Sequence, residues 1–510
     1  MAAKRTIRTI PAERTPVREQ PAAERIGGFE EVSLGYDEVE AAREAQRCLF
    51  CADTPCMRGC PVSVDIPGFI RKVSDRDYQG AYETIARTNL LPAVCGRVCP
   101  QESQCEAVCT VGDSLEPVAI GRLERFVGDL AIANDWASRP FIPPTPHRVG
   151  VIGSGPAGMA CAADLAKAGC EVTVYEALHL PGGVLRYGIP DFRLPSEVID
   201  AEVANLERLG VRFECNTVVG RLFTPEQMIE EMGFDAVFIG TGAGYPTMLG
   251  IPGDSLGGVL SANELLTRAN LMQARDFPVY DTPIPLGTHV AVVGAGNTAM
   301  DAMRVCLRLG AETVQCLYRR SAAEAPARAE ELHHAEQEGV EFHWLTNPVE
   351  VLDDGQGNVG GLRCQRMELG EPDASGRRRP VPVPGSEFVM RCDQVVFAIG
   401  TNANPIIGQT SRLSLDKRGY LRVDEDLATS MAGVFAGGDI VTGAATVIEA
   451  MGAGRRAAAG ILRYLGVRDE SLPYDALGEP VFGIAPHEHS FVRLRVAETP
   501  STHRTAVTAR

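Results

Sequence analysis

The feature that most constrains this 510-residue chain is a short apolar segment that runs directly into a glycine-rich turn, and it occurs twice. One copy lies at residues 148–158 and the other at residues 288–299. Each copy precedes a predicted helix and a second apolar strand. This order is typical of dinucleotide-binding domains, whose strands form parallel sheets. We therefore expect an α/β fold with two Rossmann-like domains.

The first turn has the spacing of a complete dinucleotide fingerprint, with Gly153, Gly155 and Gly158 after the strand. The first glycine permits the tight turn, the second lets the backbone approach a pyrophosphate, and the third lets helix and strand pack closely. Phosphate oxygens would lie at the helix N-terminus, where free N–H groups favour an anion. Glu176 follows the second strand and is expected to accept hydrogen bonds from a ribose. The alternative is a glycine-rich turn in an unrelated α/β fold.

A third apolar strand near the C-terminus ends in Gly437-Gly438-Asp439, and a helix rich in small residues follows at 444–460. It resembles the second flavin fingerprint of flavoproteins with two dinucleotide-binding domains. By that resemblance Asp439 holds the ribityl chain, and the backbone of Ala445 and Thr446 stabilises negative charge on reduced flavin. A buried aspartate that only caps a helix is the alternative. Together with the first turn, this motif predicts FAD in a domain that the chain leaves and re-enters.

The second turn has an alanine in the third position. Its residues expected to bind the nucleotide are Gly294, Gly296, Asn297, Thr298 and Ala299. The next strand ends in Arg319-Arg320, with no acid where an NAD ribose hydroxyl would be bound. Two arginines can pair with a 2′-phosphate, so the sequence favours NADPH over NADH. The alternative places both arginines on a solvated turn.

Eight of the 15 cysteines fall between residues 48 and 109. Because the chain has no recognisable secretion signal, such clustering favours metal ligation over disulfides. The spacings, with Cys-Pro pairs at Cys60 and Cys99, are ferredoxin-like and predict two [4Fe–4S] clusters. Two four-cysteine zinc sites are the alternative. No CxxC follows Cys109, so electrons from a flavin would leave through these clusters.

Charge and hydropathy exclude other classes of function. The net charge is −17, which makes a large nucleic-acid interface improbable. No apolar run reaches the ~18 residues of a membrane span. The N-terminal segment lacks an apolar signal core, and we expect a cytoplasmic protein.

The expected domain order follows from these motifs and from the Pro-rich linker at 139–146. Asp37 is a plausible N-cap for the first helix, and His333-His334 is expected on an exposed helix. The predicted segments are an N-terminal arm (1–36), a helical [4Fe–4S] domain (37–140), an FAD-binding domain in two parts (147–275 and 396–466), an NADPH-binding domain (276–395) and a C-terminal tail without visible periodicity (467–510).

Several longer motifs resemble the small (β) subunit family of NADPH-dependent glutamate synthase. This family includes the large subunit of NADH-dependent ferredoxin:NADP oxidoreductase (sulfide dehydrogenase) and the N-terminal half of dihydropyrimidine dehydrogenase. The resemblance runs from about residue 29 to 465, and its most specific segments are 56–67, 95–102, 120–126, 182–190 and 436–446.

The resemblance also implies a ligand assignment. One cluster would be held by Cys48, Cys51, Cys56 and Cys109. The other would be held by Cys60, Cys99 and Cys105. Its fourth ligand is either Glu124, which matches the position of an amide ligand in dihydropyrimidine dehydrogenase, or Cys95; we favour Glu124, although a carboxylate is a harder ligand than a thiolate. Gly182, Gly183 and the segment 187–190 would lie near the flavin.

By this resemblance, NADPH reduces FAD and the clusters pass electrons to a large subunit that makes glutamate from 2-oxoglutarate and glutamine. The alternative is the ferredoxin:NADP oxidoreductase branch, with a small flavin-reductase-type subunit and ferredoxin as partners. An oligomer is expected in either case. A scaffold with degenerate nucleotide sites is a third reading, which the intact glycine motifs disfavour.

Overall fold

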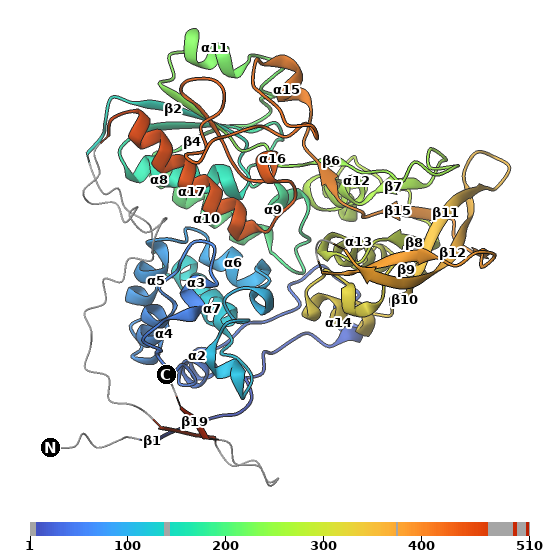
Figure 1. Cartoon of the computed structure of the whole chain (residues 1–510), viewed down its shortest axis with the longest axis horizontal. Coiled ribbons are helices and arrows are strands. Elements are labelled where there is room, and N and C mark those ends of the chain that lie inside the picture. The colour runs from blue at the N-terminus through green and yellow to red at the C-terminus, as the bar shows by residue number, and fades with distance from the viewer. Residues whose placement is uncertain (1–6, 137–142, 374–375, 468–492, 497–505, 509–510) are drawn as a thin grey trace.

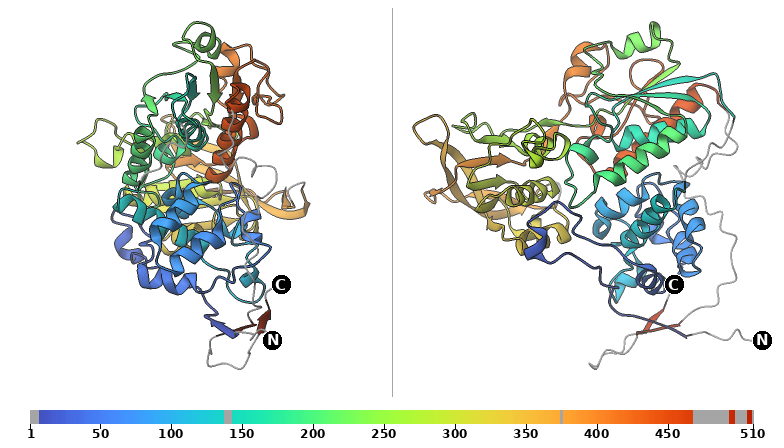
Figure 2. Two further views of the ribbon diagram at one scale, coloured as in Figure 1. Left: turned by 90° about the vertical axis from the view of Figure 1, so that its left-hand side faces the viewer. Right: turned by 180° about the vertical axis from the view of Figure 1, so that it is seen from behind.

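A computed structural model describes residues 7–136, 143–373, 376–467, 493–496 and 506–508. These residues form a helical domain and two α/β domains (Figure 1). The views of Figure 2 show the helical domain beneath the first α/β domain, with the second α/β domain to one side. A single hydrophobic core extends from the helical domain into the first α/β domain, so these two parts pack as one body.

The helical domain begins at a well-formed cap. The Asp37 carboxylate accepts hydrogen bonds from the backbone of Val39 and Glu40, each at 2.9 Å, as the sequence predicted. The cysteine-bearing loops lie between short helices. The elements are α2 (Glu38–Ala45), α3 (Pro55–Arg58), α4 (Ile66–Ser74), α5 (Tyr78–Ala86), α6 (Pro92–Val98), the 3-10 turns η1 (Gln101–Ser103) and η2 (Thr110–Asp113), and α7 (Ile120–Ala133).

The first α/β domain contains a five-stranded parallel sheet in the order β17-β5-β2-β3-β4. Its central strands are buried and apolar because helices cover both faces. The chain leaves after β5 and returns at β17, which pairs with β5, as expected. The elements are β2 (Arg148–Ile152), α8 (Pro156–Lys167), β3 (Glu171–Tyr175), α9 (Val184–Tyr187), α10 (Ser196–Arg208), β4 (Arg212–Glu214), α11 (Pro225–Glu230), β5 (Ala236–Ile239), α15 (Ile406–Thr410), β17 (Val434–Ala436), α16 (Asp439–Thr442) and α17 (Val447–Tyr464).

The second α/β domain repeats the plan with a parallel sheet in the order β10-β9-β8-β15-β7. An antiparallel sheet of four strands, β11 to β14, extends from its edge (Figure 1). The elements are β7 (Val259–Ser261), α12 (Ala262–Leu266), the π-type turn η3 (Thr267–Leu271), the 3-10 turn η4 (Ala274–Asp276), β8 (His289–Val293), α13 (Asn297–Arg308), β9 (Thr313–Tyr318), the 3-10 turn η5 (Ala322–Glu324), α14 (Ala329–Gln337), β10 (Glu341–Trp344), β11 (Thr346–Asp353), β12 (Val359–Pro372), β13 (Arg378–Pro382), β14 (Phe388–Met390) and β15 (Gln394–Phe397).

The boundary between the α/β domains differs from the expected one at residue 275. Strand β7 already pairs with β15 of the second sheet, so the chain crosses earlier. The crossing is marked by an antiparallel pair of two-residue strands, β6 (Tyr245–Pro246) and β16 (Thr401–Asn402). A three-residue strand such as β7 is too short to show a period in the sequence.

The arm and the tail also contain short elements. The arm contains β1 (Ile7–Ile10) and helix α1 (Ala22–Arg25), and the tail contains β18 (Arg493–Val496) and β19 (Ala506–Thr508). These strands form a small sheet in the order β1-β18-β19 beside the helical domain (Figure 1).

The predicted fold class, two Rossmann-like domains preceded by a helical domain, is confirmed. None of the helices in the described ranges combines the length and the apolar character needed to cross a bilayer.

Candidate functional site

The first glycine turn joins β2 to α8 at the carboxyl edge of its sheet. Gly158 allows the close approach predicted for it, because a Cβ there would lie 1.9 Å from the Gly153 carbonyl oxygen. A Cβ on Gly155 would meet no atom within 4 Å, so this side of the turn is open. An open backbone turn at a helix N-terminus is the geometry that a pyrophosphate requires.

Glu176 lies at the end of β3 and reaches back to this turn. Its carboxylate accepts hydrogen bonds from the Ser154 backbone at 3.0 Å and from the Ser154 hydroxyl at 2.5 Å. The same hydroxyl accepts a hydrogen bond from the backbone of Gly182 at 3.0 Å. A Cβ on Gly183 would lie 2.7 Å from the Cα of Gly155. The segment that carries Gly182 and Gly183 is therefore folded against the first turn.

The C-terminal motif reaches the same place from the other side. A Cβ on Gly454 of α17 would lie 2.0 Å from the Ala157 carbonyl oxygen, so α17 and α8 cross in backbone contact. Asp439 starts α16, and its carboxylate accepts a hydrogen bond from the Ala445 backbone at 3.2 Å. Burial raises the pKa of Asp439 to about 6. Burial, then Asp439 and Glu176, raise the pKa of Tyr187 to about 12, so these three side chains share one site.

Thr446 begins α17 as its N-cap, in a capping box with Glu449. This position at a helix N-terminus is compatible with the predicted role of the Thr446 backbone, which is to stabilise negative charge on a reduced flavin.

The second glycine turn has the same construction. A Cβ on Gly294 would lie 2.3 Å from the Ala398 carbonyl oxygen, and the side of Gly296 meets only Pro326, at 3.8 Å. Asn297 is the first residue of α13, and its side chain accepts a hydrogen bond from the Arg328 backbone at 2.9 Å. Thr298 follows in the first turn of α13, and Ala299 is fully buried against the core of this domain.

The two arginines after β9 have different surroundings. Arg320 is buried and forms an ion pair with Asp373 at 2.7 Å, and it donates a hydrogen bond to the Arg378 carbonyl oxygen at 2.8 Å. Arg319 is exposed. Of the pair predicted to bind a 2′-phosphate, Arg319 is therefore the one whose guanidinium faces solvent.

The eight clustered cysteines separate into two sets in the helical domain. The first set lies around Cys56: burial raises the pKa of its thiol, followed by the charges of three neighbouring cysteines. Thr110 lies 3.4 Å from the Cys51 sulfur. The members are Cys48, Cys51, Cys56 and Cys109, the same four that the family resemblance groups together.

The second set lies around Cys105. Burial raises the pKa of this thiol, and Glu106, Cys60, Glu124 and Cys99 act in the same direction. Both candidates for the fourth ligand are present. Glu124 is buried, and burial raises its pKa to about 7 although its carboxylate accepts a hydrogen bond from Asn89 at 2.7 Å. The Cys95 sulfur lies 3.6 Å from the Asn89 side-chain oxygen.

The distances between ligand atoms can be compared with those that a zinc site requires. A zinc ion holds its thiolates at ~2.3 Å, which brings them within about 4 Å of one another. Among the described residues, only Glu19, Glu330 and His334 place three ligand atoms within 4.8 Å of each other, and none of these is a cysteine. As placed, no three cysteine sulfurs of the described residues lie that close, an arrangement that is compatible with a larger cluster with four corners.

That carboxylate–histidine group corrects one expectation. His333 is exposed as predicted, but His334 is buried, and its Nε2 lies 3.2 Å from the Glu19 carboxylate of the arm. The arm covers this face of α14, which the helix sequence alone does not reveal.

Helix α17 joins the second cysteine set to the first glycine turn. The Met451 sulfur lies 3.6 Å from the Cys95 sulfur, and the Gln104 side chain donates to the Thr446 hydroxyl at 3.4 Å. Gly452 faces the carbonyl oxygen of Pro61, directly after Cys60. The second set is thus in contact with the helix whose N-terminus borders Asp439.

Comparison with known proteins adds independent findings. Residues 147–454 match the family described as pyridine nucleotide-disulphide oxidoreductase, and residues 25–136 match dihydropyrimidine dehydrogenase domain II, 4Fe-4S cluster. The glutamate synthase [NADPH] small chain of Halomonas elongata is 39% identical over 458 residues, covering 88% of this chain and 96% of that protein. The chain belongs to the glutamate synthase small-chain family.

Other known proteins are similar over much of the same region. The small chain of Azospirillum brasilense is 38% identical over 473 residues, covering 90% of this chain and 96% of that protein. The NADP(+)-dependent formate dehydrogenase subunit beta of Moorella thermoacetica is 42% identical over 436 residues, but the match covers only 60% of that protein. Mycobacterium tuberculosis FprA in complex with NADPH has a TM-score of 0.54 at 22% identity, covering 63% of this chain and 85% of that chain, which supports the fold.

The small-chain family member described here is therefore a pyridine-nucleotide oxidoreductase with an iron–sulfur domain. Its residues fit the expected cofactors. The open side of Gly155 fits a pyrophosphate, and the half-buried Asp439 carboxylate fits a partner with hydroxyl groups. The two cysteine sets fit thiolate-bound clusters.

Sequence reasoning missed three residues that connect these parts: Asn89, Gln104 and Arg328. Each acts through a partner far away in the chain, such as Glu124 for Asn89 and Thr446 for Gln104. No local motif marks them, and only their closeness to the cysteine and glycine motifs in space reveals them.

Proposed function

We propose that this small-chain family member is the electron-input subunit of an NADPH-dependent glutamate synthase. When bound, FAD would accept a hydride from NADPH and pass electrons singly to two [4Fe–4S] clusters. The observation that carries the proposal is α17, whose N-terminus borders Asp439 and whose Met451 contacts Cys95. One rigid element thus connects the flavin site to the second cysteine set.

The residues of the chain would act by binding and orientation. Glu176 and the first glycine turn would hold the ribose and the pyrophosphate of FAD, and Asp439 would hold its ribityl chain. The second turn and Arg319 would hold NADPH. The contacts of α17 with Cys95 and Gln104 support an order of the two cysteine sets, in which the second set would lie next to the flavin site and the first set would be the outlet.

The partner would be a glutamate synthase large subunit, in which the electrons convert 2-oxoglutarate and glutamine to glutamate. The family relationship supports this partner. A second candidate is the same module in another NADP-dependent assembly, such as the ferredoxin:NADP oxidoreductase type with a small flavin subunit. The 42% identity to the beta subunit of an NADP(+)-dependent formate dehydrogenase supports this second candidate.

An anaerobic affinity purification from the native cells tests the partner. A co-purifying chain of the glutamate synthase large-subunit type, with glutamate formed from NADPH, 2-oxoglutarate and glutamine, would support the first proposal. A small flavin subunit or a formate dehydrogenase subunit in its place would overturn it in favour of the second.

A further inference from the structure

Arg328 lies at the junction of the three domains, directly before α14. Its backbone N–H donates to the Asn297 side chain at 2.9 Å, and the preceding Ala327 donates to the Ala295 carbonyl oxygen at 3.1 Å. Both acceptors belong to the second glycine turn. The backbone of Arg328 is therefore fixed to the loop at which NADPH is expected to bind.

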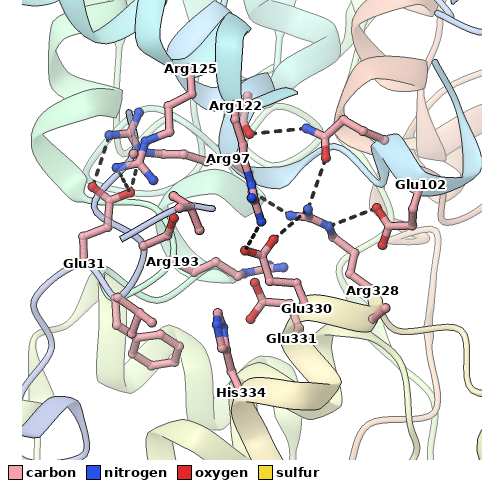
Figure 3. Close-up of a pocket in the computed structure, with 18 of the residues that line it drawn as sticks. Glu31, Arg97, Glu102, Arg122, Arg125, Arg193, Arg328, Glu330, Glu331 and His334 are labelled. Atoms are coloured by element: carbon pink, nitrogen blue, oxygen red, sulfur yellow. Dashed lines mark hydrogen bonds and ion pairs between the residues drawn. The ribbon is translucent and has the colours of Figure 1, made fainter. Parts of the chain in front are cut away.

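The side chain of Arg328 leaves this domain and enters the helical domain (Figure 3). Its guanidinium donates to the Arg97 carbonyl oxygen at 2.8 Å and to the Gln101 side-chain oxygen at 3.1 Å. These two acceptors stand two residues before and two residues after Cys99. Gln101 in turn donates to the Cys95 carbonyl oxygen at 3.1 Å. One arginine thus clamps the loop that carries Cys99 of the second set.

The charge of Arg328 is buried, with 9% of the residue exposed. Glu330 lies 3.1 Å away and Glu102 lies 3.5 Å away, and both are more exposed than the arginine. The guanidinium therefore places a buried positive charge beside the loop that carries Cys99.

Arg193, at the same interdomain cavity, offers a matched comparison with Arg328. A cavity of about 170 Å³ lies between the domains and is lined by several arginines and glutamates (Figure 3). Arg193, from the first α/β domain, crosses the same cavity to Asp301 of the second α/β domain at 2.8 Å. Arg193 thus joins two domains, as Arg328 does, but Asp301, the partner of Arg193, does not belong to a loop that carries a cysteine of either set.

We propose that Arg328 is a positioning and tuning residue for the second cluster site, to which it brings a positive charge from the NADPH-binding domain. The inference rests on the proposed function. A [4Fe–4S] cluster becomes more negative when it accepts an electron, and a nearby positive charge stabilises that state. Arg328 therefore raises the reduction potential of the second cluster and favours electron transfer onto it from the flavin.

The test is an anaerobic redox titration of the full-length holoprotein, with both clusters followed by electron paramagnetic resonance. Arg328→Gln should shift the second cluster to a lower potential and leave the first cluster unchanged. Arg328→Lys keeps the charge and should titrate close to wild type. Arg193→Gln breaks an interdomain ion pair at the same cavity and should also titrate as wild type. The rate at which NADPH bleaches the flavin is measured in all four proteins, and it should be the same in Arg193→Gln as in the wild type.

An unchanged reduction potential of the second cluster in Arg328→Gln would overturn the inference. An equal shift of that potential in Arg193→Gln would also overturn it, because the effect would then come from domain packing. Loss of the second cluster from Arg328→Lys as well, seen as halved iron content, would overturn the tuning role, because hydrogen bonds rather than charge would then hold the site. Failure of NADPH to bleach the wild-type flavin, or wild-type protein without clusters, would instead overturn the proposed function.

Discussion

Arg319 and Arg320 are neighbours in sequence, but they face different surroundings at the end of β9. Arg320 is engaged by Asp373 of the β12–β13 hairpin, and Arg319 is exposed. Arg319→Ala should therefore raise the KM for NADPH about 10- to 100-fold, because a charge-assisted contact with the 2′-phosphate is worth ~1.5–3 kcal/mol. The KM for NADH should change little, since NADH lacks that phosphate. Steady-state kinetics with both nucleotides measures the difference.

Arg320→Ala is the matched comparison. It breaks a buried ion pair and should lower thermal stability more than Arg319→Ala does, because it leaves Asp373 without this partner. Equal effects of Arg319→Ala on NADPH and NADH would contradict the 2′-phosphate assignment.

The fourth ligand of the second cluster is also a question at the residue scale. If Glu124 is the ligand, Glu124→Ala should lower the iron content from about eight to about four atoms per chain. Cys95→Ser should in that case keep about eight, because Cys95, whose sulfur lies beside Asn89, Met451 and Cys99, is then not a ligand. Iron and sulfide analysis of the anaerobically purified proteins decides between them. The reverse pattern would assign the ligand to Cys95.

At the scale of elements, the crossing of α17 over α8 holds the flavin site together. Gly454→Ala would place a Cβ 2.0 Å from the Ala157 carbonyl oxygen. Overpacking of this kind costs ~1–3 kcal/mol and would move the N-terminus of α17 away from Asp439. We expect a lower melting temperature and less FAD per chain, measured by thermal unfolding and by flavin absorbance. Arg456→Ala, at an exposed position of the same helix, should change neither. Full FAD content in Gly454→Ala would refute the role of this crossing.

The stability of the protein should depend on pH because of Glu202 in helix α10. Burial raises the pKa of Glu202 from 4.5 to about 8. The folded state then holds a proton that the unfolded state releases between these values, so stability falls as pH rises from about 4.5 to 8. Glu202→Gln removes this loss and should stabilise the protein by on the order of 1 kcal/mol or more at pH 8.5, and by less at pH 5.5. Thermal unfolding at both pH values measures it.

Glu207→Gln, at an exposed position of α10, is the control and should have no such pH dependence. A gain for Glu202→Gln that is equal at the two pH values would show that the proton is not the cause.

At the scale of the whole molecule, the sequence predicted what depends on local pattern. The two glycine turns, the Asp37 cap and the division of the cysteines into two sets follow from short motifs or from the family that they identify. The β6–β16 crossing, the burial of His334 by the arm and the bridge made by Arg328 depend on contacts between segments far apart in the chain. No periodicity or spacing encodes such contacts, because they arise only when complete domains pack together.

The central proposal concerns the route of the electrons through the whole molecule: electrons from NADPH would pass from the flavin site through the second cysteine set and leave at the first. Helix α17 contacts the second set through Met451, whereas Cys48 belongs to the first set. This order of the two sets predicts that loss of a ligand from the first set leaves reduction of the flavin by NADPH intact and blocks electron delivery to the partner.

The most direct measurement is anaerobic stopped-flow reduction of Cys48→Ser by NADPH, followed by transfer to the purified partner subunit. We expect the flavin of this variant to bleach at the wild-type rate while electron delivery to the partner is lost. Wild-type delivery, or loss of flavin reduction itself, would contradict this route for the electrons.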